Sequence, residues 1–574
     1  MKLTPWRSGR GRAGVPAVFV VLGLVLAACG GPSLPASVTT GTKVAVAWPG
    51  VLTSLNAATA AGATAGDRDV AAMTRSHFAE VVEGKVVPDT SFGKVTIVRK
   101  QPFTVRYDLA KPVWSDGIAV DAADLLLAWA AGSDTAAGFE PASADLAKSD
   151  HLVAFEESKR AIEVSFSEPE PDWNTALDVA VPAHVVGRLA FGLDDPMEAK
   201  KAVTDAIRDG DEAALAKIAK AWNGGFSVDA GTTPAGSRLL SSGPYRIEKV
   251  SGADGAQRVD LIANGAYAGA QKPTIARVSL RQTADDQRLA VLGTSADVVE
   301  LTPTIENWQA VHDLERRDYQ VGMGNDGTMW VLALRTDHGL FTRPKASAAF
   351  LRSVPRGDLI SAGAGGWDDA YTGSDALVYA TGSAGYDEAL EDSGFQEKLG
   401  KAGNGTDDLT AAGLQPGTKV CVAYDSSSEF ARGAFGAMVS GMSEAGWVVT
   451  DCGKAGLAEP ADAPKADAAL VRVAVPQDPA GLAALWRSDA EHSLTGVSDN
   501  ERDALLDQLA LTTDPYDARD LRGQIERTIV DDAVALPIAM NPVVTVTSPR
   551  ISGVKVRPGP VAPVTAYVAE WGLS

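Results

Sequence analysis

The chain has few cysteines and few histidines, and this scarcity removes whole classes of site. Its 574 residues include three Cys and six His. The histidines lack the His-x-x-x-His or His-Glu-x-x-His spacing of a zinc site. The sequence also has no Gly-x-Ser-x-Gly elbow, no Walker phosphate loop and no dinucleotide fingerprint. We therefore expect no enzyme activity, with no catalytic residues, no metal and no cofactor.

Positive charge is also scarce. The sequence has 52 Lys and Arg against 73 Asp and Glu, a formal net charge of −21. Binding to nucleic acid needs a basic face that releases counterions from phosphates, so a nucleic-acid partner is not expected. The hydrophobic share of 45% is that of a globular chain.

Long apolar runs are confined to the N-terminus. Four basic residues up to Arg12 precede an apolar run from Ala13 to Leu26, and Leu26-Ala27-Ala28-Cys29 follows. The run is too short to span a bilayer and has the flanks of a signal peptide. The Leu-Ala-Ala-Cys sequence matches a bacterial lipobox, whose Cys receives diacylglycerol; the alternative is an ordinary signal peptide with a chance Cys. We predict a signal peptide at 1–28, a lipid on Cys29 and a flexible tether at 29–41. The protein would then be anchored to the cell membrane, on its extracytoplasmic face, with a net charge of −25.

Two cysteines remain after lipidation, Cys421 and Cys452, with 30 residues between them. Each lies in a strand-like segment, and a helical stretch ending at Gly446 separates the two segments. This strand–helix–strand pattern predicts two parallel strands in one sheet. In an oxidising compartment the two cysteines could form a disulfide, and two buried free thiols are the alternative.

Alternation and helical periodicity predict further elements along the chain. A helix is predicted from Asp121 to Ala130, with Asp121 as its N-cap and Asp124 at its third position. Other predicted elements are a strand at Thr42–Trp48, a helix at Asp67–Val82, strands at Phe103–Leu109 and Ala161–Phe166, and helices across Ala199–Trp222 interrupted by Asp-Gly-Asp at 209–211.

Several local motifs then occur in a fixed order. They are Pro102-Phe-Thr-Val-Arg-Tyr-Asp-Leu109, Trp114-Ser-Asp-Gly117, Asp121 to Trp129, Pro182-Ala-His-Val185, Ser242-Gly-Pro-Tyr245, Asn264-Gly-Ala-Tyr267 with Lys272-Pro273, Thr495 to Asn500 and Asp531 to Pro537. The ordered set resembles the family 5 extracellular solute-binding proteins, which include the oligopeptide- and dipeptide-binding lipoproteins of ABC importers. Most of these motif residues read as structural; Trp114 and Tyr245, for example, are expected in the core.

The resemblance implies two α/β lobes with a ligand cleft between them. The first lobe would comprise 42–312 with an inserted subdomain at about 65–150, and would be completed by 528–574. The second lobe would span 313–527. A chain that crosses twice between lobes has paired hinge strands, which suits closure around a ligand. The expected partners are a small solute such as a peptide, and the permease subunits of an ABC importer; a monomer is expected.

The ligand is less clear from the sequence. Peptide binders of the family hold the peptide amine with an Asp in the second lobe, and the corresponding stretch here places Val475 at that position. Candidate ligand-binding residues are Trp48, Trp330, Tyr424, Gln477, Asp478, Trp486 and Arg487.

A second hypothesis is a regulator that kept the binding-protein fold. The chain is also similar to a mycobacterial lipoprotein of this superfamily that influences lipomannan and lipoarabinomannan synthesis. The shared features are Pro-Phe-Thr-Val-x-Tyr, Pro-Ala-His, and a C-terminal pattern of Leu536-Pro-Ile538 and Trp571.

Overall fold

The computed structural model describes residues 34–82, 84–133, 137–149, 151–253, 255–401, 403–556 and 563–574. The predicted signal peptide, Cys29 and the first part of the predicted tether lie outside these ranges. Among the described residues, no helix combines the length and apolar character that crossing a membrane requires.

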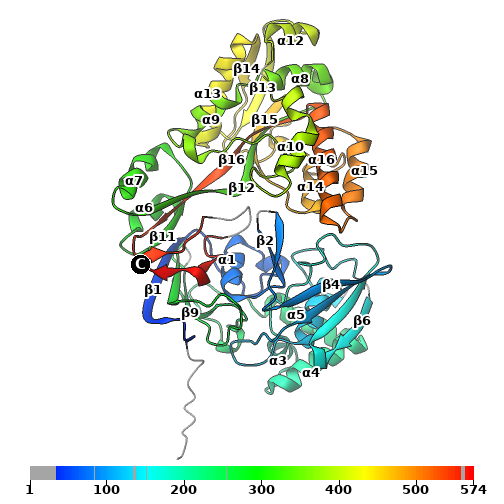
Figure 1. Ribbon diagram of the computed structural model, residues 1–574, viewed down its shortest axis with the longest axis vertical. Helices are drawn as coiled ribbons and strands as arrows, with labels where there is room; N and C mark the ends of the chain where they lie inside the picture. Colours follow the sequence, from blue (N-terminus) through cyan, green and yellow to red (C-terminus); the bar gives the residue numbers. More distant parts are fainter. Residues whose placement is uncertain are drawn as a thin grey trace, which may run out of the picture.

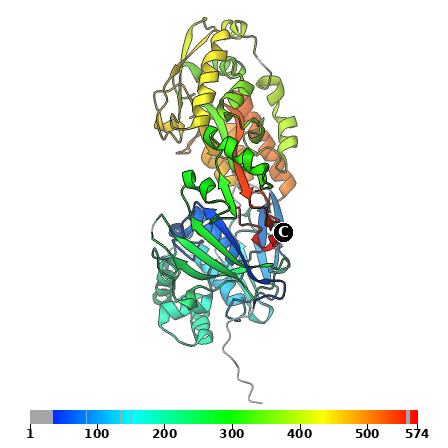
Figure 2. The same cartoon turned by 90° about the vertical axis from the view of Figure 1, so that its left-hand side faces the viewer.

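The chain folds into two lobes, placed one above the other in Figures 1 and 2. The lower lobe is formed mainly by the N-terminal half and the upper lobe by the second half. Each lobe has its own apolar core, around residues such as Val46 and Leu280 in the first and Leu332 and Val422 in the second. The predicted two-lobed α/β fold is confirmed.

One large sheet runs through both lobes. Within the described ranges its ten strands are, in order across the sheet, β14 (Trp447–Asp451), β13 (Thr418–Tyr424), β15 (Ala468–Ala474), β12 (Gln320–Leu334), β16 (Ala535–Thr547), β11 (Val298–Leu301), β1 (Thr39–Trp48), β10 (Ile275–Gln282), β9 (Arg258–Ala263) and β8 (Tyr245–Ser251). The long strands β12 and β16 lie in its middle and pair antiparallel. They connect the lobes (Figure 1).

Side-chain pattern explains which strands lie at the surface. Strand β9 alternates buried Val259 and Leu261 with more exposed Arg258 and Asp260, so one of its faces lies toward solvent. Every residue of β16 is buried, as its mostly apolar sequence predicts for a strand covered on both faces.

A second sheet forms a subdomain of the first lobe. Its order is β4 (Gly93–Lys100), β5 (Phe103–Leu109), β7 (Ala161–Phe166) and β6 (His151–Glu156), all antiparallel. Strands β5 and β7 have the predicted bounds. Two short pairs complete the strands: β2 (Ala79–Val82) with β3 (Lys85–Pro88), and β17 (Ile551–Ser552) with β18 (Gly572–Leu573).

One predicted helix was wrong in its second half. Helix α1 covers Ala65–Thr74 and stops there, and Ala79–Val82 is strand β2. The apolar spacing of Ala79–Val82 fits either structure. Pairing with β3 across a tight turn selects the strand.

The helices cover the faces of the sheets. In the first half they are α2 (Ala122–Ser133), α3 (Ala183–Phe191), α4 (Pro196–Asp209), α5 (Glu212–Gly224), α6 (Asp285–Val291) and α7 (Ile305–Glu315). In the second half they are α8 (Pro344–Arg352), α9 (Arg356–Ala364), α10 (Tyr386–Ser393), α11 (Phe395–Lys398), α12 (Thr406–Ala411), α13 (Glu429–Glu444), α14 (Pro479–Trp486), α15 (Asn500–Leu509) and α16 (Pro515–Asp532).

Predicted helix ends are confirmed in two places. Asp121 accepts a hydrogen bond from the amide of Ala123, and Asp124 accepts one from the amide of Asp121, so α2 is capped as expected. Gly210 ends α4 with a φ of +65°, and Asp211 caps α5. The Asp-Gly-Asp sequence thus separates two helices.

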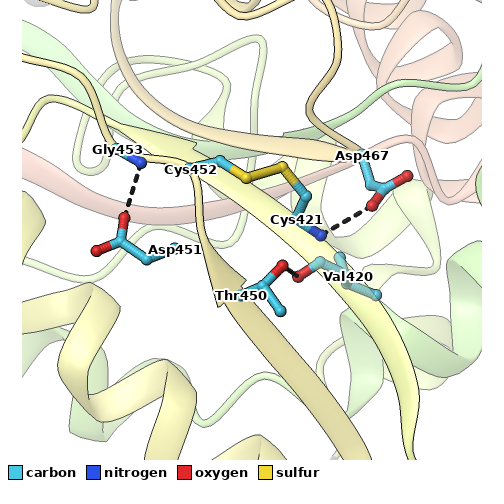
Figure 3. Close-up of a disulfide and its surroundings, with 7 residues drawn as sticks. All are labelled: Val420, Cys421, Thr450, Asp451, Cys452, Gly453 and Asp467. Carbon is cyan, nitrogen blue, oxygen red and sulfur yellow. Dashed lines mark hydrogen bonds between the residues drawn. A yellow bond between two sulfur atoms is a disulfide. The ribbon is translucent and has the colours of Figure 1, made fainter.

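Cys421 and Cys452 are joined by a disulfide, with their Cα atoms 5.7 Å apart (Figure 3). It links β13, whose last residue is Tyr424, to the end of β14, and the two strands are parallel as predicted. The backbone amide of Cys421 donates to Asp467 (2.8 Å), and Thr450 donates to the carbonyl of Val420 (3.2 Å). The disulfide therefore joins the edge strand β14 to its neighbour β13 in the upper lobe.

Candidate ligand-binding site between the lobes

The pairing of the two strands that connect the lobes is irregular at two places. Pairing of β12 with β16 runs from Gln320 opposite Thr547 to Ala333 opposite Ala535, and its register shifts between Trp330 and Val331 and, more widely, between Asn325 and Met329. Gly327 has a φ of +78° there, which a residue without Cβ adopts at no steric cost. The shift is a bulge, a feature that bends a strand locally.

The bulge lies beside the end of β15. Thr328 pairs with Ala474, and the amide of Val475 donates to the carbonyl of Gly327 (2.9 Å). The segment after β15, which contains Gln477 and Asp478, therefore emerges from the sheet where the chain passes between the lobes.

Polar side chains converge on this bulge. The indole N–H of Trp330 donates to Asn541 Oδ1 (3.0 Å), and Asn541 Nδ2 donates to Asp326 Oδ2 (2.7 Å). Arg472 places Nη1 3.7 Å from the same carboxylate oxygen. Asn541 lies on β16, so these contacts join β12, β15 and β16 at one point.

Aromatic rings continue the group. The ring of Trp330 stacks on Phe430 with centroids 4.8 Å apart, and Phe430 stacks on Tyr371 at 4.7 Å. Burial raises the pKa of Tyr371; the carboxylates of Asp326 and Glu429 raise it further, and Arg472 opposes them. We call Asp326, Trp330, Tyr371, Phe430, Arg472 and Asn541 the hinge cluster. It combines stacking surfaces, one guanidinium and one carboxylate, which suits a small polar solute.

Carboxyl groups of both lobes contribute to raised pKa values near the boundary between the lobes. Asp145, Glu170 and Asp172 belong to the first lobe, and Asp478 begins α14 in the second; we call these four the interlobe acidic patch. Burial raises the pKa values of Asp145 and Asp172, and the Asp478 carboxylate adds to the rise of both. This electrostatic effect therefore acts between the lobes.

Burial and mutual repulsion raise the pKa values of carboxyl groups in this patch. Burial raises the pKa of Glu170 to about 7, and the neighbouring Asp172 and Asp145 add to the effect. Burial raises the pKa of Asp172 to about 6, with further contributions from Asp145 and Asp478, while Arg522 lowers it. A cation placed between the lobes would relieve this repulsion.

Arg522 on α16 is the cation that lowers the pKa of Asp172. Its Nη2 donates to the carbonyl of Gln477 (3.0 Å), and its guanidinium lies over the ring of Tyr379, 5.7 Å from the centroid. It therefore holds the segment before Asp478 in place and only partly offsets the patch.

The structure brings three of the predicted ligand residues to this junction. Trp330 belongs to the hinge cluster, and Gln477 and Asp478 follow β15. Asp478 also caps α14, with Oδ1 accepting from the amide of Gly481 (2.6 Å). Val475 is buried in the apolar core of the second lobe, 3% exposed.

The other four predicted ligand residues are engaged elsewhere. Trp48 is buried and donates to Asp69 Oδ2 (2.7 Å). Tyr424 stacks on Phe435 and donates to Asp451 (3.3 Å). Trp486 is packed in the second lobe's core, and Arg487 pairs with Asp507.

Sequence reasoning missed most of the hinge cluster and the acidic patch. One signal was available, because Asn325-Asp326-Gly327 is a turn-forming triplet inside an otherwise strand-like segment. No comparable local sequence pattern distinguishes Asn541 or Tyr371. Across the described ranges, no group of three or more His, Cys, Asp or Glu side chains has a geometry that could hold a metal ion.

Comparison with known proteins agrees with this architecture. An uncharacterized lipoprotein of Mycobacterium tuberculosis is 25% identical over 545 residues, which cover 91% of each chain. An uncharacterized lipoprotein of Mycobacterium leprae is 27% identical over 351 residues, which cover 60% of this chain and 55% of that protein.

Solved structures show the same fold. A periplasmic EDTA-binding protein, EppA, has a TM-score of 0.72 and 18% identity, with 95% of this chain and 98% of that chain covered. The oligopeptide-binding protein AppA of Bacillus subtilis, solved with a nonapeptide, has a TM-score of 0.60 and 13% identity, with 93% and 99% covered.

The sequence pattern of one family matches more than half of the chain. Residues 100–428 match the family described as bacterial extracellular solute-binding proteins, family 5. The match spans the subdomain sheet, the strand β12 and the first part of the second lobe. The chain belongs to the family 5 bacterial extracellular solute-binding proteins.

Proposed function

We propose that this protein is the solute-binding lipoprotein of an ABC-type importer, which binds a short peptide between its lobes and delivers it to a permease. The observation that carries the proposal is the bulge at Asn325–Met329 in the paired strands β12 and β16, with the hinge cluster around it. A bent crossing point lets two lobes close, and the cluster supplies ligand contacts at that point. A ligand that contacts both lobes stabilises the closed state by its differential affinity.

The proposed attachment to the membrane is through a lipid on Cys29, on the extracytoplasmic face. Two observations support it: the Leu-Ala-Ala-Cys sequence, and the description of the mycobacterial relatives as lipoproteins. Stable anchoring needs more than one acyl chain, which a diacylglyceryl group supplies.

The lobe boundaries are also part of the proposal. We propose a first lobe of 42–312 and 528–574 and a second lobe of 313–527. The inserted subdomain, expected at about 65–150, continues to the end of β7 at Phe166, because β6 and β7 complete its sheet. The pivot would then lie inside β12 at the bulge, which begins after Asn325, 12 residues beyond the proposed boundary at 313.

A peptide would be held differently from the family's usual mode, because the expected carboxylate is replaced by buried Val475. The interlobe acidic patch supplies carboxylates from both lobes, and Asp172 and Asp478 could share a peptide amine between them. The ammonium group would offset the repulsion that raises the pKa of Asp172. Neighbours of this fold include proteins solved with a nonapeptide and with a nickel–histidine complex, so the fold alone does not select the ligand.

The test uses the mature chain with Cys29→Ser, first by native mass spectrometry for a co-purified ligand and then by thermal titration. Tri- to pentapeptides with a free amine should raise the Tm, since a ligand at 100 times its Kd adds about 2.7 kcal/mol of stability. N-acetylated forms of the same peptides should bind at least tenfold more weakly. The absence of any peptide-dependent shift would overturn the peptide proposal.

A matched pair of variants locates the amine. Asp478→Asn removes the charge but keeps the helix cap, since Asn caps helices as well as Asp does. It should weaken the binding of peptides with a free amine and leave the binding of acetylated peptides unchanged. Asp195→Asn makes the same change at the cap of α4, away from the junction, and should have no effect. Equal effects of both variants would contradict the proposal that the interlobe acidic patch binds the peptide amine.

One observation favours the second candidate function, regulation of cell-envelope glycolipid synthesis. Val475 lies in an apolar core, so the position that binds peptide amines in the family has no carboxylate here. A Tm increase with polyprenyl glycolipid head groups, and none with peptides, would put this function first.

A further inference from the structure

A second cavity lies on the first lobe, away from the junction between the lobes. It has a volume of about 630 Å³, and its polar lining includes Lys43, Arg281, Thr294, Ser295, Asp297 and Arg550. Its lining also includes Thr40 near the start of β1 and Leu573 near the C-terminus.

Positive charge exceeds negative charge in this cavity. The Arg550 guanidinium binds the Asp297 carboxylate, with Nε 2.7 Å from Oδ1. Asp297 also accepts from the amide of Ala45 (2.8 Å), so its charge is already engaged. Within the described part of the chain, neither Lys43 nor Arg281 has an ion-pair partner. The cavity therefore holds two uncompensated cations in a chain of strongly negative net charge.

Two buried polar atoms on β10 lack partners; Arg281 lines the cavity, and Ser279 lies next to the lining residues without being one of them. Ser279 is 1% exposed, and neither its hydroxyl nor Arg281 Nε has a hydrogen-bond partner among the described residues. Ser279 and Arg281 are two residues apart on β10, so their side chains lie on the same face of the sheet. Ser279 pairs in register with Ala45, which lines the cavity. Buried donors without partners are uncommon in folded proteins and call for an explanation such as a ligand.

Two other arginines on this sheet face are already paired. Arg277 binds Glu248 (2.9 Å), and Arg258 binds Asp260 (2.8 Å). Arg246, in register with Ile262 and Arg277 on the same face, lies outside the cavity lining, and its Nε also has no hydrogen-bond partner among the described residues.

We propose that this cavity binds the phosphate group of an anionic phosphoester, and that phospholipid head groups of the anchoring membrane supply it. Lys43 and Arg281 provide charge, and Thr294 and Ser295 provide hydroxyl donors, which together suit a phosphate. The volume exceeds what a bare phosphate needs, so it has room for the organic part of an ester. About ten residues separate Cys29 from the start of β1, and ten extended residues span at most ~35 Å, which keeps the cavity within reach of the bilayer.

The choice of lipid as the source rests on the proposed anchor, but phosphate binding itself does not. The test uses the mature chain with Cys29→Ser, with two probes. The first is inorganic phosphate, followed by titration calorimetry and thermal shift. The second is vesicles of phosphatidylcholine with and without 30% phosphatidylglycerol, followed by flotation.

Variants distinguish phosphate binding in the cavity from nonspecific attraction to basic residues. Lys43→Gln changes an exposed side chain and should fold normally. Arg281→Gln removes the partly buried guanidinium. Each should weaken phosphate binding at least tenfold, and both should reduce flotation with phosphatidylglycerol vesicles. Arg277→Gln removes the same charge from the same strand, outside the cavity, and should leave binding within twofold.

The outcomes are distinct. Phosphate binding lost in Lys43→Gln and Arg281→Gln, together with flotation lost in the same variants, would support the site and its lipid source. Phosphate binding without flotation would overturn the lipid source and leave a soluble phosphoester as the ligand. No phosphate binding, or an equal loss in Arg277→Gln, would overturn the site. None of these results depends on whether peptides bind between the lobes.

Discussion

Trp330 on β12 donates its indole N–H to the side-chain oxygen of Asn541 on β16, at the point where both strands pass between the lobes. Asn541 in turn donates to Asp326. One amide thus satisfies a donor and an acceptor from the opposite strand, and both partners are at the bulge. These hydrogen bonds hold β12 and β16 together where they pass between the lobes, although the backbone of β12 is irregular there.

Replacing Asn541 by Leu should destabilise this crossing point. The change leaves the buried Trp330 N–H without its acceptor, which costs about 1–3 kcal/mol. It also removes one donor from the partly exposed Asp326 carboxylate, which keeps its hydrogen bonds from Thr328. We expect a lower Tm by calorimetry and faster hydrogen exchange in β12 and β16. Asn223→Leu, which removes an exposed hydrogen bond to Gly138, is the control and should change the Tm much less. Similar losses in the two variants would contradict a special role for Asn541.

Removing the disulfide should loosen the edge of the upper lobe. A cross-link closing a loop of this length contributes about 3–4 kcal/mol by restricting the unfolded chain. Cys421→Ala with Cys452→Ala should therefore lower the Tm and speed hydrogen exchange in β13 and β14, with little change in the first lobe. Wild-type protein treated with reductant serves as the comparison and should behave like the double variant. Unchanged exchange in these strands would show that the packing of β13 suffices without the bond.

The stability of the interlobe acidic patch should depend on pH in a defined direction. The pKa values of Glu170, about 7, and Asp172, about 6, are raised in the folded chain. Between about pH 4 and 7 the folded chain therefore holds more protons at these groups than the unfolded chain does. Their contribution to stability is full below pH 4 and is lost as the pH rises through 6 and 7.

The double variant Glu170→Gln with Asp172→Asn removes this titration. Its Tm relative to wild type should rise by about 1–3 °C between pH 5 and pH 8, because only the wild type loses stability there. Glu157→Gln, at an exposed position, is the control and should show no such trend. A constant difference between the double variant and wild type across this range would contradict the raised pKa values.

Local sequence patterns were sufficient for much of the fold. Strand β5 has the predicted bounds because its alternating residues fix both the period and the buried face. The cap at Asp121 was also predictable, since a cap depends on residues within one turn. The helix predicted through Val82 failed for the opposite reason: its last residues pair with β3, and no local pattern encodes that pairing.

The candidate site required information that the sequence does not carry locally. Trp330 and Asn541 are 211 residues apart, and only the pairing of β12 with β16 brings them together. The Asp478 carboxylate acts on the pKa of Asp172 only because of the way the two lobes are placed. Trp486, an aromatic side chain near the expected ligand segment, packs in the core of the second lobe, and no local pattern shows this. Motifs identified the family, whereas the contacts between lobes depend on tertiary structure.

A buried ion cluster gives the last prediction, because it ties α4 to the start of α2. Lys200 Nζ lies 2.9 Å from Asp121 Oδ2 and 3.0 Å from Asp124 Oδ2, and it donates to the carbonyl of Ala119 (2.8 Å). Lys200 is 3% exposed and Asp124 is 1% exposed. Replacing Lys200 by Met leaves two neighbouring carboxylates without their cation, and breaking a buried pair in this way costs about 3–5 kcal/mol.

The loss in Lys200→Met should grow with pH. Burial and the charge of Asp124 already raise the pKa of Asp121, and Lys200 is the group that lowers it. Without the lysine, Asp121 should stay protonated to a higher pH, so the carboxylates repel each other less at pH 5 than at pH 8. The Tm deficit of the variant should accordingly be larger at pH 8. Lys201→Met removes the neighbouring lysine, which is 75% exposed and paired with Asp205, and a surface pair of this kind contributes only about 0–1 kcal/mol. If the Tm deficit of Lys200→Met did not change with pH, lost packing would account for the instability. The charge of two carboxylates left without their cation would then not be its cause.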